Sequence, residues 1–466
     1  MKDSKVVSSL REAIRLSGLK DGMCISFHHH LRNGDYVVNM VMEQISAMGI
    51  RDLTVNASAL FDVHLPMLEH IKNGTVSKLL TNYMSAGLGR AISEGVMEQP
   101  VEFRTHGGRP RDIASGATPI DVAFIAAPSS DTMGNCTGKI GKSACGSLGY
   151  AFPDAQYAKK VIVITDELVP YPLCGWSIPE IYVDYVVAVD AAGIVSGTTR
   201  MTRNPVAITI AQTAARVIAC SGLLKDGFSF QTGAGGASLA TAMYLGKIMK
   251  QQNIHGSYAQ GGITGLLVDM LNEGLFRALL DVQCFDLKAV SSIRENPCHC
   301  EVSAEQYASP GCRSAAVDSL DVAVLGATEI DTSFHINVHT DSNGSIMGGS
   351  GGHSDAAAGS KLALIAAPLF RGRLPIVRDR VTCISTPGQD VDVLVTQAGV
   401  AVNPKNAELR ERLWEARLPV VDIQELKERA ERITGTPAPL PVSDRVVAKV
   451  ISRDGELLDT IRQVGR

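Results

Sequence analysis

Three glycine-rich segments place residue types suited to anion or acyl chemistry at predicted turns. Residues 228–237 run from a predicted strand through a glycine turn into a predicted helix, residues 259–265 set Gln260 beside two glycines, and residues 348–355 precede helical sequence. Glycines allow backbone N–H groups to approach an anion or a thioester oxygen at a helix N-terminus. The third segment is also typical of a flexible lid or an anion-binding turn. Simple strand-to-helix turns, or a linker in the third case, account for the same residues without a ligand.

Two basic segments indicate recognition of a polyanion. Residues 28–30 are three histidines that follow a predicted strand shortly before Arg32, and residues 104–111 contain three arginines and a histidine. Planar guanidinium groups pair with carboxylates in a bidentate way, so residues 104–111 suit a tricarboxylate. Purely structural polar contacts, or a solvated surface for residues 104–111, are the competing interpretations. Consecutive strand residues point to opposite faces, so the three histidines do not readily bind one metal ion.

Other motifs fail on spacing. Residues 141–143 read Gly-Lys-Ser like the end of a phosphate-binding loop, but the required first glycine falls at Cys136. The cysteines at 298, 300 and 312 lack the Cys-x-x-Cys pairs of a structural zinc site. No Gly-x-Ser-x-Gly motif of a serine hydrolase occurs. We therefore expect no metal site and no serine nucleophile.

The elements that must position these residues alternate between strands and helices. Apolar runs typical of strands buried on both faces of a parallel sheet occur at residues 161–164, 322–325 and 393–395. Amphipathic helices are predicted at residues 37–48, 85–97, 239–250 and 406–416. This alternation predicts right-handed βαβ units and doubly wound sheets. Ligands in such folds bind at the carboxyl ends of the strands or between domains.

An internal duplication divides the chain into two related halves. Residues 120–127 reappear as residues 320–327, and further matches follow in the same order at a spacing near 200 residues. Such a repeat predicts two similar doubly wound α/β domains, residues 1–220 and 221–466, with the site between them. The proline-containing tail, residues 437–466, is predicted to pack on the second domain.

The composition narrows the class of protein. The 466 residues carry a formal net charge of −4 with 44 basic and 48 acidic side chains, which leaves no basic footprint for nucleic acid. No apolar run reaches the roughly 20 residues of a membrane span, and the amphipathic N-terminal segment does not resemble a secretory signal. Ten scattered cysteines form no disulfide framework, which favours a reducing compartment. We expect a cytoplasmic protein that binds neither nucleic acid nor membrane.

Taken together, the chain resembles the citrate lyase alpha-subunit family of the CoA-transferase superfamily. The resemblance extends from about Leu10 to the last residues, and eight short stretches carry it: residues 27–29, 39–42, 105–108, 146–150, 231–240, 261–264, 351–353 and 367–373. It implies two similar α/β domains and a citrate CoA-transferase, which exchanges acetate for citrate on a thiol carried by a small acyl carrier (gamma) subunit. A beta subunit then cleaves the citryl thioester, so a hetero-oligomer is implied. No permanently bound cofactor is implied, because the CoA-derived thioester is a co-substrate.

The resemblance also bears on the mechanism. Covalent CoA-transferases use a glutamate shortly before a helix that resembles residues 268–274 here, but the matching position falls at or next to Gly261, where no carboxylate occurs. A citrate carboxylate would instead attack the acetyl thioester directly, and the released thiolate would attack the resulting mixed anhydride. Three alternatives stay open. They are a citramalate-specific transferase, a catalytically silent scaffold subunit, and an ordinary acyl-CoA:carboxylate transferase with a glutamyl intermediate at Glu295, Glu301 or Glu329.

Direct transfer requires positioned reactants and donors for an oxyanion. Backbone N–H groups of residues 233–236 and 261–262 are expected to be those donors, and loss of one typically costs about 10²–10³ in kcat. Gln260 is expected to orient the attacking carboxylate. The expected site residues are Gln260, Gly261 and Gly262 for catalysis, Gly233, Gly235, Gly236, Gly351 and Gly352 for the CoA-derived co-substrate, and His28, His29, Arg32, His106 and Arg109 for citrate.

Overall fold

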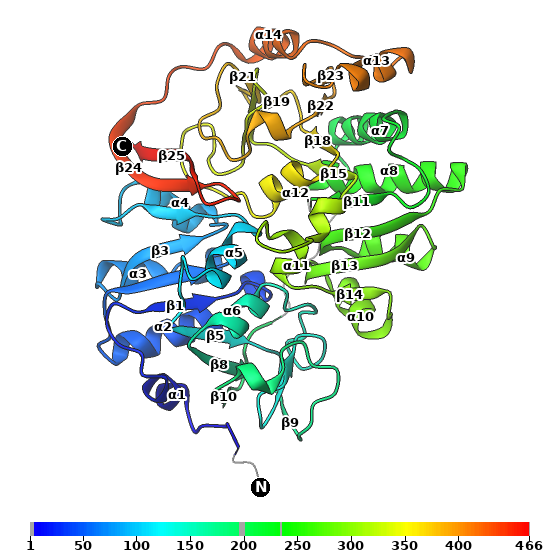
Figure 1. Cartoon of the computed structure of the whole chain (residues 1–466). Coiled ribbons are helices and arrows are strands. Elements are labelled where there is room, and N and C mark those ends of the chain that lie inside the picture. The colour runs from blue at the N-terminus through cyan, green and yellow to red at the C-terminus, as the bar shows by residue number, and fades with distance from the viewer. Residues whose placement is uncertain (1–3, 195–200, 234, 466) are drawn as a thin grey trace.

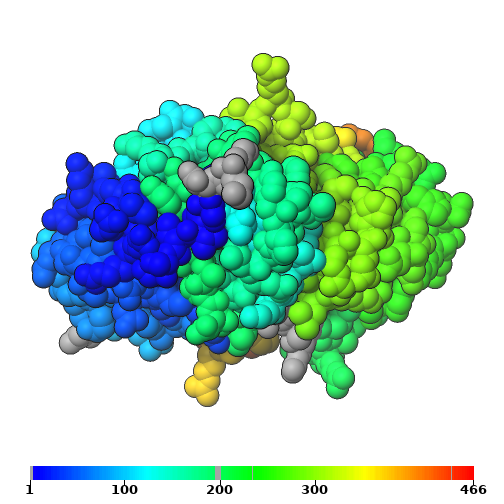
Figure 2. All heavy atoms as spheres, turned by 90° about the horizontal axis from the view of Figure 1, so that it is seen from below, coloured from blue at the N-terminus to red at the C-terminus, as the bar shows by residue number. Residues whose placement is uncertain are grey.

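The computed structural model describes residues 4–194, 201–233 and 235–465, and these residues form two α/β domains, each built on a mainly parallel sheet (Figure 1). Figure 2 shows a face on which the first domain, coloured blue to teal, lies directly against the second, coloured green to yellow-green. In the described part of the chain, no helix combines the length and the apolar character that crossing a membrane requires. Ala234, in the predicted glycine turn, lies outside the described residues.

The first sheet has nine strands, of which only the last pair is antiparallel. In spatial order they are β10 (Tyr185–Ala188), β8 (Lys160–Thr165), β5 (Val122–Ala126), β1 (Cys24–Phe27), β2 (Leu53–Ala57), β3 (Val76–Thr81), β4 (Val101–Phe103), β24 (Val442–Ile451) and β25 (Leu457–Val464). The helices of this domain are α1 (Leu10–Ser17), α2 (Val37–Ala47), α3 (Met67–Lys72), α4 (Ala86–Ser93), α5 (Gly108–Ala114) and α6 (Ala151–Tyr157).

The second sheet has eight strands and ends in one antiparallel pair. In spatial order they are β14 (His299–Glu301), β13 (Phe276–Cys284), β12 (Gly256–Ile263), β11 (Ser229–Thr232), β15 (Val322–Leu325), β18 (Leu362–Ala366), β22 (Val393–Thr396) and β23 (Gly399–Val402). The helices of this domain are α7 (Pro205–Cys220), α8 (Gly236–Gln252), α9 (Gly265–Asn272), α10 (Leu287–Glu295), α11 (Ala304–Ala308), α12 (His353–Gly359), α13 (Ala407–Glu415) and α14 (Ile423–Thr434).

The two sheets share one strand order, which confirms the predicted pair of doubly wound α/β folds. The order β4-β3-β2-β1-β5-β8-β10 corresponds position by position to β14-β13-β12-β11-β15-β18-β22. Each half also carries a small three-stranded sheet at the matching place. One comprises β7 (Cys136–Thr137), β6 (Ser129–Asp131) and β9 (Leu168–Val169), and the other comprises β17 (Ile336–Asn337), β16 (Glu329–Asp331) and β21 (Val377–Arg378). A further antiparallel pair joins β19 (Phe370–Arg371) to β20 (Leu374–Pro375).

Local sequence explains where these elements form. Every residue of β5, β15, β18 and β22 is buried, as expected for apolar strands covered on both faces of a sheet. Helix α7 begins at Pro205 and is capped by Asn204, whose side chain accepts the N–H of Val206. Helix α10 is capped by the carboxylate of Asp286, which accepts the N–H of Ala289.

Two predicted boundaries differ from the structure. The tail belongs to the first sheet and not to the second domain, because β24 pairs in parallel with β4 and extends that sheet, with β25 at its edge (Figure 1). This addition covers an edge that would otherwise expose unpaired backbone groups. Asp459 and Arg453 of the tail also contact Ile384 and Asp355 of the second domain across the boundary. Helix α7, which the boundary at residue 220 placed in the first domain, packs against α8 and contributes Ile210 and Ile218 to the apolar core of the second domain.

Candidate functional site

A cavity of about 350 Å³ lies between the two domains, where the carboxyl ends of strands from both sheets approach each other. Its first-domain wall includes His29, which follows β1, and His106, which follows β4. Its second-domain wall includes Gly233 after β11, Phe285 after β13 and Gly326 after β15. This is the position at which open α/β sheets bind ligands.

Backbone contacts join the domains around this cavity. The N–H of His106 donates to the carbonyl of Gly351 at 2.8 Å, and the N–H of Gly351 donates to the carbonyl of Asn82 at 3.1 Å. On the opposite wall, the amide Nε2 of Gln283 donates to the carbonyl of His29 at 2.9 Å. Hydrogen bonds across the domain boundary therefore hold the elements around the cavity in place.

The structure brings some of the expected site residues to the cavity and places others behind it. Those that line it are His29, Arg32, His106, Gly233, Gly262, Gly351 and Gly352. Those that do not line it are His28, Arg109, Gly235, Gly236, Gln260 and Gly261. The N–H of Gly233 donates to the carbonyl of Val324 at 3.0 Å, so this amide and that of Gly351 already have partners in the protein.

Two histidines and a tyrosine form a stacked group in the first-domain wall. The ring of Tyr150 lies 4.5 Å from His29 and 4.4 Å from His106. The Nδ1 atom of His106 accepts a hydrogen bond from the side-chain amide of Asn82 at 2.9 Å, which leaves the proton on Nε2, next to Gly351. Burial lowers the pKa of His106 to about 3 and that of His29 well below its usual range. Both rings are therefore neutral at pH 7, and His106 can donate a hydrogen bond without carrying a charge.

Arg32 supplies the permanent positive charge of the cavity. Of the described lining residues, only Arg32 carries such a charge, and its guanidinium lies 5.7 Å from the ring of Phe61 and 4.8 Å from that of Phe285. The backbone of Arg32 has a φ of 55°, a left-handed conformation that costs a non-glycine residue about 1–3 kcal/mol. Residues held in such a conformation cluster at functional sites.

Close packing explains two of the lining glycines. A Cβ atom at Gly262 would lie 2.1 Å from Cζ of Phe285, and one at Gly352 would lie 2.4 Å from the hydroxyl of Tyr307. Both distances are far below van der Waals contact, so these two positions have no room for a side chain. Glycine at these positions leaves room for the aromatic rings that form the cavity wall. Steric space therefore explains these glycines without any role in oxyanion binding.

Gln260 lies one layer behind the wall. Its amide Nε2 donates to Oε1 of Gln231 at 3.0 Å, and Nε2 of Gln231 donates to the hydroxyl of Tyr307 at 2.9 Å. Gln231 and Tyr307 line the cavity, whereas the side chain of Gln260 is fully buried. Gln260 is therefore placed to orient Gln231 and not to meet a ligand.

Several residues that line the cavity were not among the site residues predicted from the sequence. Tyr150, Gln231 and His353 stand inside stretches that carry the family resemblance, so attention to polar side chains within those stretches would have identified them. Tyr307 and Phe285 stand outside any motif, and only their positions after β14 and β13 bring them to the cavity.

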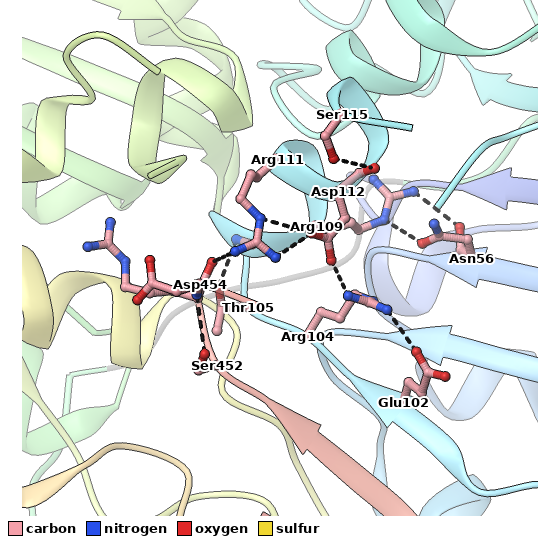
Figure 3. A network of polar contacts seen from close by, with 12 residues as sticks. Asn56, Glu102, Arg104, Thr105, Arg109, Arg111, Asp112, Ser115, Ser452 and Asp454 are labelled. Atoms are coloured by element: carbon pink, nitrogen blue, oxygen red, sulfur yellow. Dashed lines mark hydrogen bonds and ion pairs between the residues drawn. The ribbon is translucent and has the colours of Figure 1, made fainter. Parts of the chain in front are cut away.

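The arginines of residues 104–111 bind carboxylates of the protein (Figure 3). Arg104 pairs with Glu102 at 2.7 Å and with Asp112, and Arg111 also pairs with Asp112. Arg109 is 2% exposed, and its guanidinium contacts Asp154 and Asn56. The segment is a structural network beside the site, and only its histidine reaches the cavity.

His28 also has partners within the protein. Its Nε2 accepts the N–H of Ala126 at 2.9 Å, and its Nδ1 lies against Nδ1 of His30. Burial lowers the pKa of His28 to about 4, so this ring too is neutral at pH 7.

The three glutamates considered as covalent acyl acceptors lie away from the cavity. Glu295 is exposed beside Arg294. The side chain of Glu301 contacts Lys139 and Ser177 of the first domain, each at 2.8 Å. Buried Glu329 pairs with Arg378 at 2.7 Å. None of the described residues that line the cavity is an aspartate or a glutamate.

One group of side chains has the composition of a metal site. Asp281, Cys284 and His299 are buried, and their ligand atoms lie within 4.8 Å of one another. Oδ2 of Asp281 lies 2.9 Å from both the Cys284 thiol and Nε2 of His299, and Nδ1 of His299 contacts Ser292 at 2.9 Å. Burial raises the pKa of Cys284 well above its usual range, which keeps it a thiol. These hydrogen bonds account for the arrangement of the group.

The buried neutral histidines make stability sensitive to acid. Burial lowers the pKa of His339 to about 3 and that of His353 to about 4. The unfolded chain binds a proton at each such position near pH 6.5 and the folded chain does not, so stability falls as the pH drops below about 6.5. We expect a loss of about 1–2 kcal/mol per histidine between pH 7 and pH 5.

Urea unfolding of wild type and of His339→Gln at pH 7 and pH 5 measures this loss. His339 does not itself line the cavity: its Nδ1 contacts Ser385 at 2.6 Å, and its Nε2 accepts the N–H of Ser350 in the cavity wall at 3.3 Å. Unfolding without ligand therefore measures the effect of its replacement on stability alone. The variant should show the smaller difference between the two pH values. Equal differences would contradict the assignment.

Sequence comparison gives the relatives of this chain. The family described as "Citrate lyase, alpha subunit (CitF)" matches residues 3–464. The citrate lyase alpha chain of Escherichia coli K12 is 50% identical over 467 residues, covering 99% of this chain and 92% of that protein. The citrate lyase alpha chain of Klebsiella pneumoniae is also 50% identical, over 464 residues, covering 99% of this chain and 91% of that protein.

Comparison with solved structures identifies the same family as the sequence comparison. A structure from Streptococcus mutans, described as the alpha subunit of citrate lyase in complex with citrate, superposes with a TM-score of 0.98 at 48% identity and covers 100% of this chain and 92% of that one. The malonate decarboxylase alpha subunit of Acinetobacter baumannii has a TM-score of 0.69 at 17% identity, covering 92% of this chain and 88% of that one, and it shares the fold.

Proposed function

Because the chain belongs to the citrate lyase alpha-subunit family, we propose that its interdomain cavity holds citrate beside an acetyl thioester and transfers the thiol from acetate to citrate. The observation that carries this proposal is the polarity of the described lining, which has one permanent cation, Arg32, and no carboxylate. A guanidinium with free N–H groups suits a carboxylate of citrate. The citrate in the Streptococcus mutans structure, a protein 48% identical to this chain, supports the choice of acid.

The transfer proceeds in two steps that balance. An oxygen of a citrate carboxylate attacks the acetyl carbonyl carbon, and the C–S bond breaks to release the thiolate and a mixed anhydride. The thiolate then attacks the citryl carbonyl carbon, and acetate leaves. The absence of an aspartate or glutamate among the described lining residues supports this route over a glutamyl intermediate.

Neutral donors fit the charge that develops in this reaction. Each tetrahedral intermediate carries an oxyanion, which a preorganised N–H group stabilises without moving a proton. His106 offers its Nε2 proton at the wall, and the amide of Gln231 is held by Tyr307 and Gln260. We assign these two side chains, together with the backbone at Gly262, to the acyl group, and Arg32 to citrate.

The proposal extends to the partners of the chain. An alpha subunit is one component of the citrate lyase complex, and we propose that the acyl carrier (gamma) subunit presents the CoA-derived thioester to this cavity. The citryl-lyase (beta) subunit then consumes the product. The thioester is a co-substrate in this scheme, and the chain needs no permanently bound cofactor.

The test incubates the purified chain with acetyl-CoA and citrate and follows citryl-CoA by mass spectrometry. A parallel reaction contains citramalate, and a third adds the acyl carrier subunit. Hydroxylamine is added to samples treated with acetyl-CoA alone to trap any acyl-glutamate. We expect citryl-CoA and no modified glutamate.

Each other result has a definite meaning. A hydroxamate on a glutamate would overturn the mechanism of direct attack. Preferential formation of citramalyl-CoA would show that citramalate, and not citrate, is the acid substrate. No transfer to either acid, even with the carrier subunit, would overturn the proposed function and favour a scaffold subunit.

A further inference from the structure

Arg32 is the first residue of a turn that is hydrogen-bonded to another segment of the chain. The turn is the 3₁₀ segment η1 (Arg32–Gly34), and its first residue has a φ of 55°. The N–H of Ile194 donates to the carbonyl of Gly34 at 2.9 Å, and the N–H of Tyr36 donates to the carbonyl of Ala192 at 3.1 Å. These bonds hold the backbone after Arg32 against a neighbouring segment.

Asp35, the residue that follows the turn, contacts two different elements through its two carboxylate oxygens. Its Oδ1 accepts the N–H of Val37 at 2.7 Å and so fixes the start of α2. Its Oδ2 lies 3.3 Å from Nε2 of His64, and both side chains are at most 2% exposed. The one carboxylate therefore contacts both the first turn of α2 and an imidazole from another element.

That imidazole belongs to the segment η2 (Asp62–His64), which follows β2. Nδ1 of His64 accepts the N–H of Phe61 at 3.1 Å. Since Nδ1 accepts, the ring proton is on Nε2, the atom that faces Asp35. The His64 side chain thus packs against Asp35 at the turn that carries Arg32, at 3.3 Å and without a hydrogen bond, while it is hydrogen-bonded to the backbone of Phe61.

The ring of Phe61 lies next to the Arg32 guanidinium, 5.7 Å from its central carbon to the ring centroid. The contacts close a loop from Arg32 through Asp35, His64 and Phe61 back to Arg32. Neither Asp35 nor His64 lines the cavity. Neither contacts a ligand there, but both constrain the two residues between which the guanidinium is placed.

We propose that Asp35 and His64 are positioning residues that set the place of the Arg32 guanidinium and thereby the affinity for the carboxylates of citrate. The proposal rests on the proposed function, in which Arg32 binds citrate. A guanidinium displaced by about 1 Å loses bidentate contact with a carboxylate, and misplacements of this size cost up to about 100-fold in rate. The acyl group is assigned to other side chains, His106 and Gln231, which lie outside this set of contacts, so citrate affinity should change alone.

The experiment compares His64→Asn, which keeps an acceptor near Nδ1 but does not reach Asp35, with the milder His64→Gln, which keeps a donor near Nε2. Asp35→Asn tests the other partner. We expect the citrate KM to rise about 10- to 100-fold in His64→Asn and in Asp35→Asn, with the acetyl-CoA KM unchanged. His70→Gln, on the adjacent helix α3 and outside the loop of contacts, is the matched control and should leave both values unchanged.

Combination with Arg32→Gln separates positioning from general stability. If His64 acts through Arg32, His64→Asn has no further effect on citrate binding, measured calorimetrically, once Arg32 is glutamine. Additive losses, equal rises of both KM values, or an unchanged citrate KM in His64→Asn and Asp35→Asn would overturn the proposal. If His64→Asn does not fold, His64→Gln and Asp35→Asn undergo the same comparison. Failure of the wild-type chain to bind citrate would instead overturn the proposed function.

Discussion

Replacing Arg109 by methionine is expected to destabilise the protein by about 3–5 kcal/mol, because it leaves a buried carboxylate without its partner. Nη1 of Arg109 lies 2.8 Å from Oδ1 of Asp154, and its Nη2 lies 3.0 Å from Oδ2. Nε of Arg109 donates to Oδ1 of Asn56 at 2.8 Å. The guanidinium thus ties α5 to β2 and α6, and Arg109 and its two partners are all nearly inaccessible to solvent.

The size of this effect depends on pH. Burial raises the pKa of Asp154, and the Arg109 guanidinium opposes that rise. Without Arg109 the carboxyl binds a proton more readily, so the variant should lose less stability at pH 5 than at pH 7. Urea unfolding followed by circular dichroism at both pH values measures the difference.

The double variant Arg109→Met with Asp154→Leu supplies the control. It removes both charges from the interior, and buried ion pairs replaced by apolar side chains often recover the stability that a single replacement loses. We expect the double variant to be more stable than Arg109→Met. A single variant as stable as wild type, or a double variant less stable than the single, would contradict this account.

Replacing Arg32 by glutamine is expected to lower kcat/KM for citrate about 100-fold. A hydrogen bond to a charged group contributes about 1.5–3 kcal/mol, and each 1.36 kcal/mol corresponds to a factor of about ten. The described lining offers a trianionic ligand no other permanent cation. The loss should appear mainly in the KM for citrate, because Arg32 contacts the bound acid and not the thioester in the proposed scheme.

Arg32→Lys and Arg11→Gln are the matched controls. Lysine keeps the charge but not the planar fork, so it should recover only part of the affinity. Arg11 is exposed on α1, and its replacement should leave citrate kinetics unchanged. Calorimetric titration with citrate checks the binding step directly. Wild-type affinity in Arg32→Gln would exclude Arg32 from the citrate site.

The fold was largely predictable because its signals are local or repeated. Residues 120–127 and 320–327 became β5 and β15 with their following turns, and these strands occupy equivalent central positions in the two sheets. The histidines after β1 and the glycine turn after β11 follow equivalent strands, and His29 and Gly233 accordingly line one cavity. Parallel sheets dictate this outcome, since the carboxyl ends of their strands lie at one edge.

The sequence did not reveal which polar residues face the cavity and which pair with other residues of the protein. Arg32 and Arg109 are both arginines in basic segments near strand ends, yet Arg32 reaches the cavity and Arg109 pairs with Asp154. Asp154 is 45 positions away along the chain. Spacing in sequence cannot reveal a partner on another helix, so the structural and the ligand-binding arginine look alike until the chain is folded.

The C-terminal strands show the same limit. The tail was predicted to pack on the second domain, but the partner of β24 is β4, which lies more than 300 residues earlier in the first domain. The sequence by itself determined the duplicated α/β architecture, the family and the segments that meet at the interdomain cavity, because hydrophobic period, glycine turns and repeats are properties of neighbouring residues. Tertiary structure alone decided which side chains face the ligand and which neutralise one another, because burial and pairing depend on contacts between residues distant in the chain.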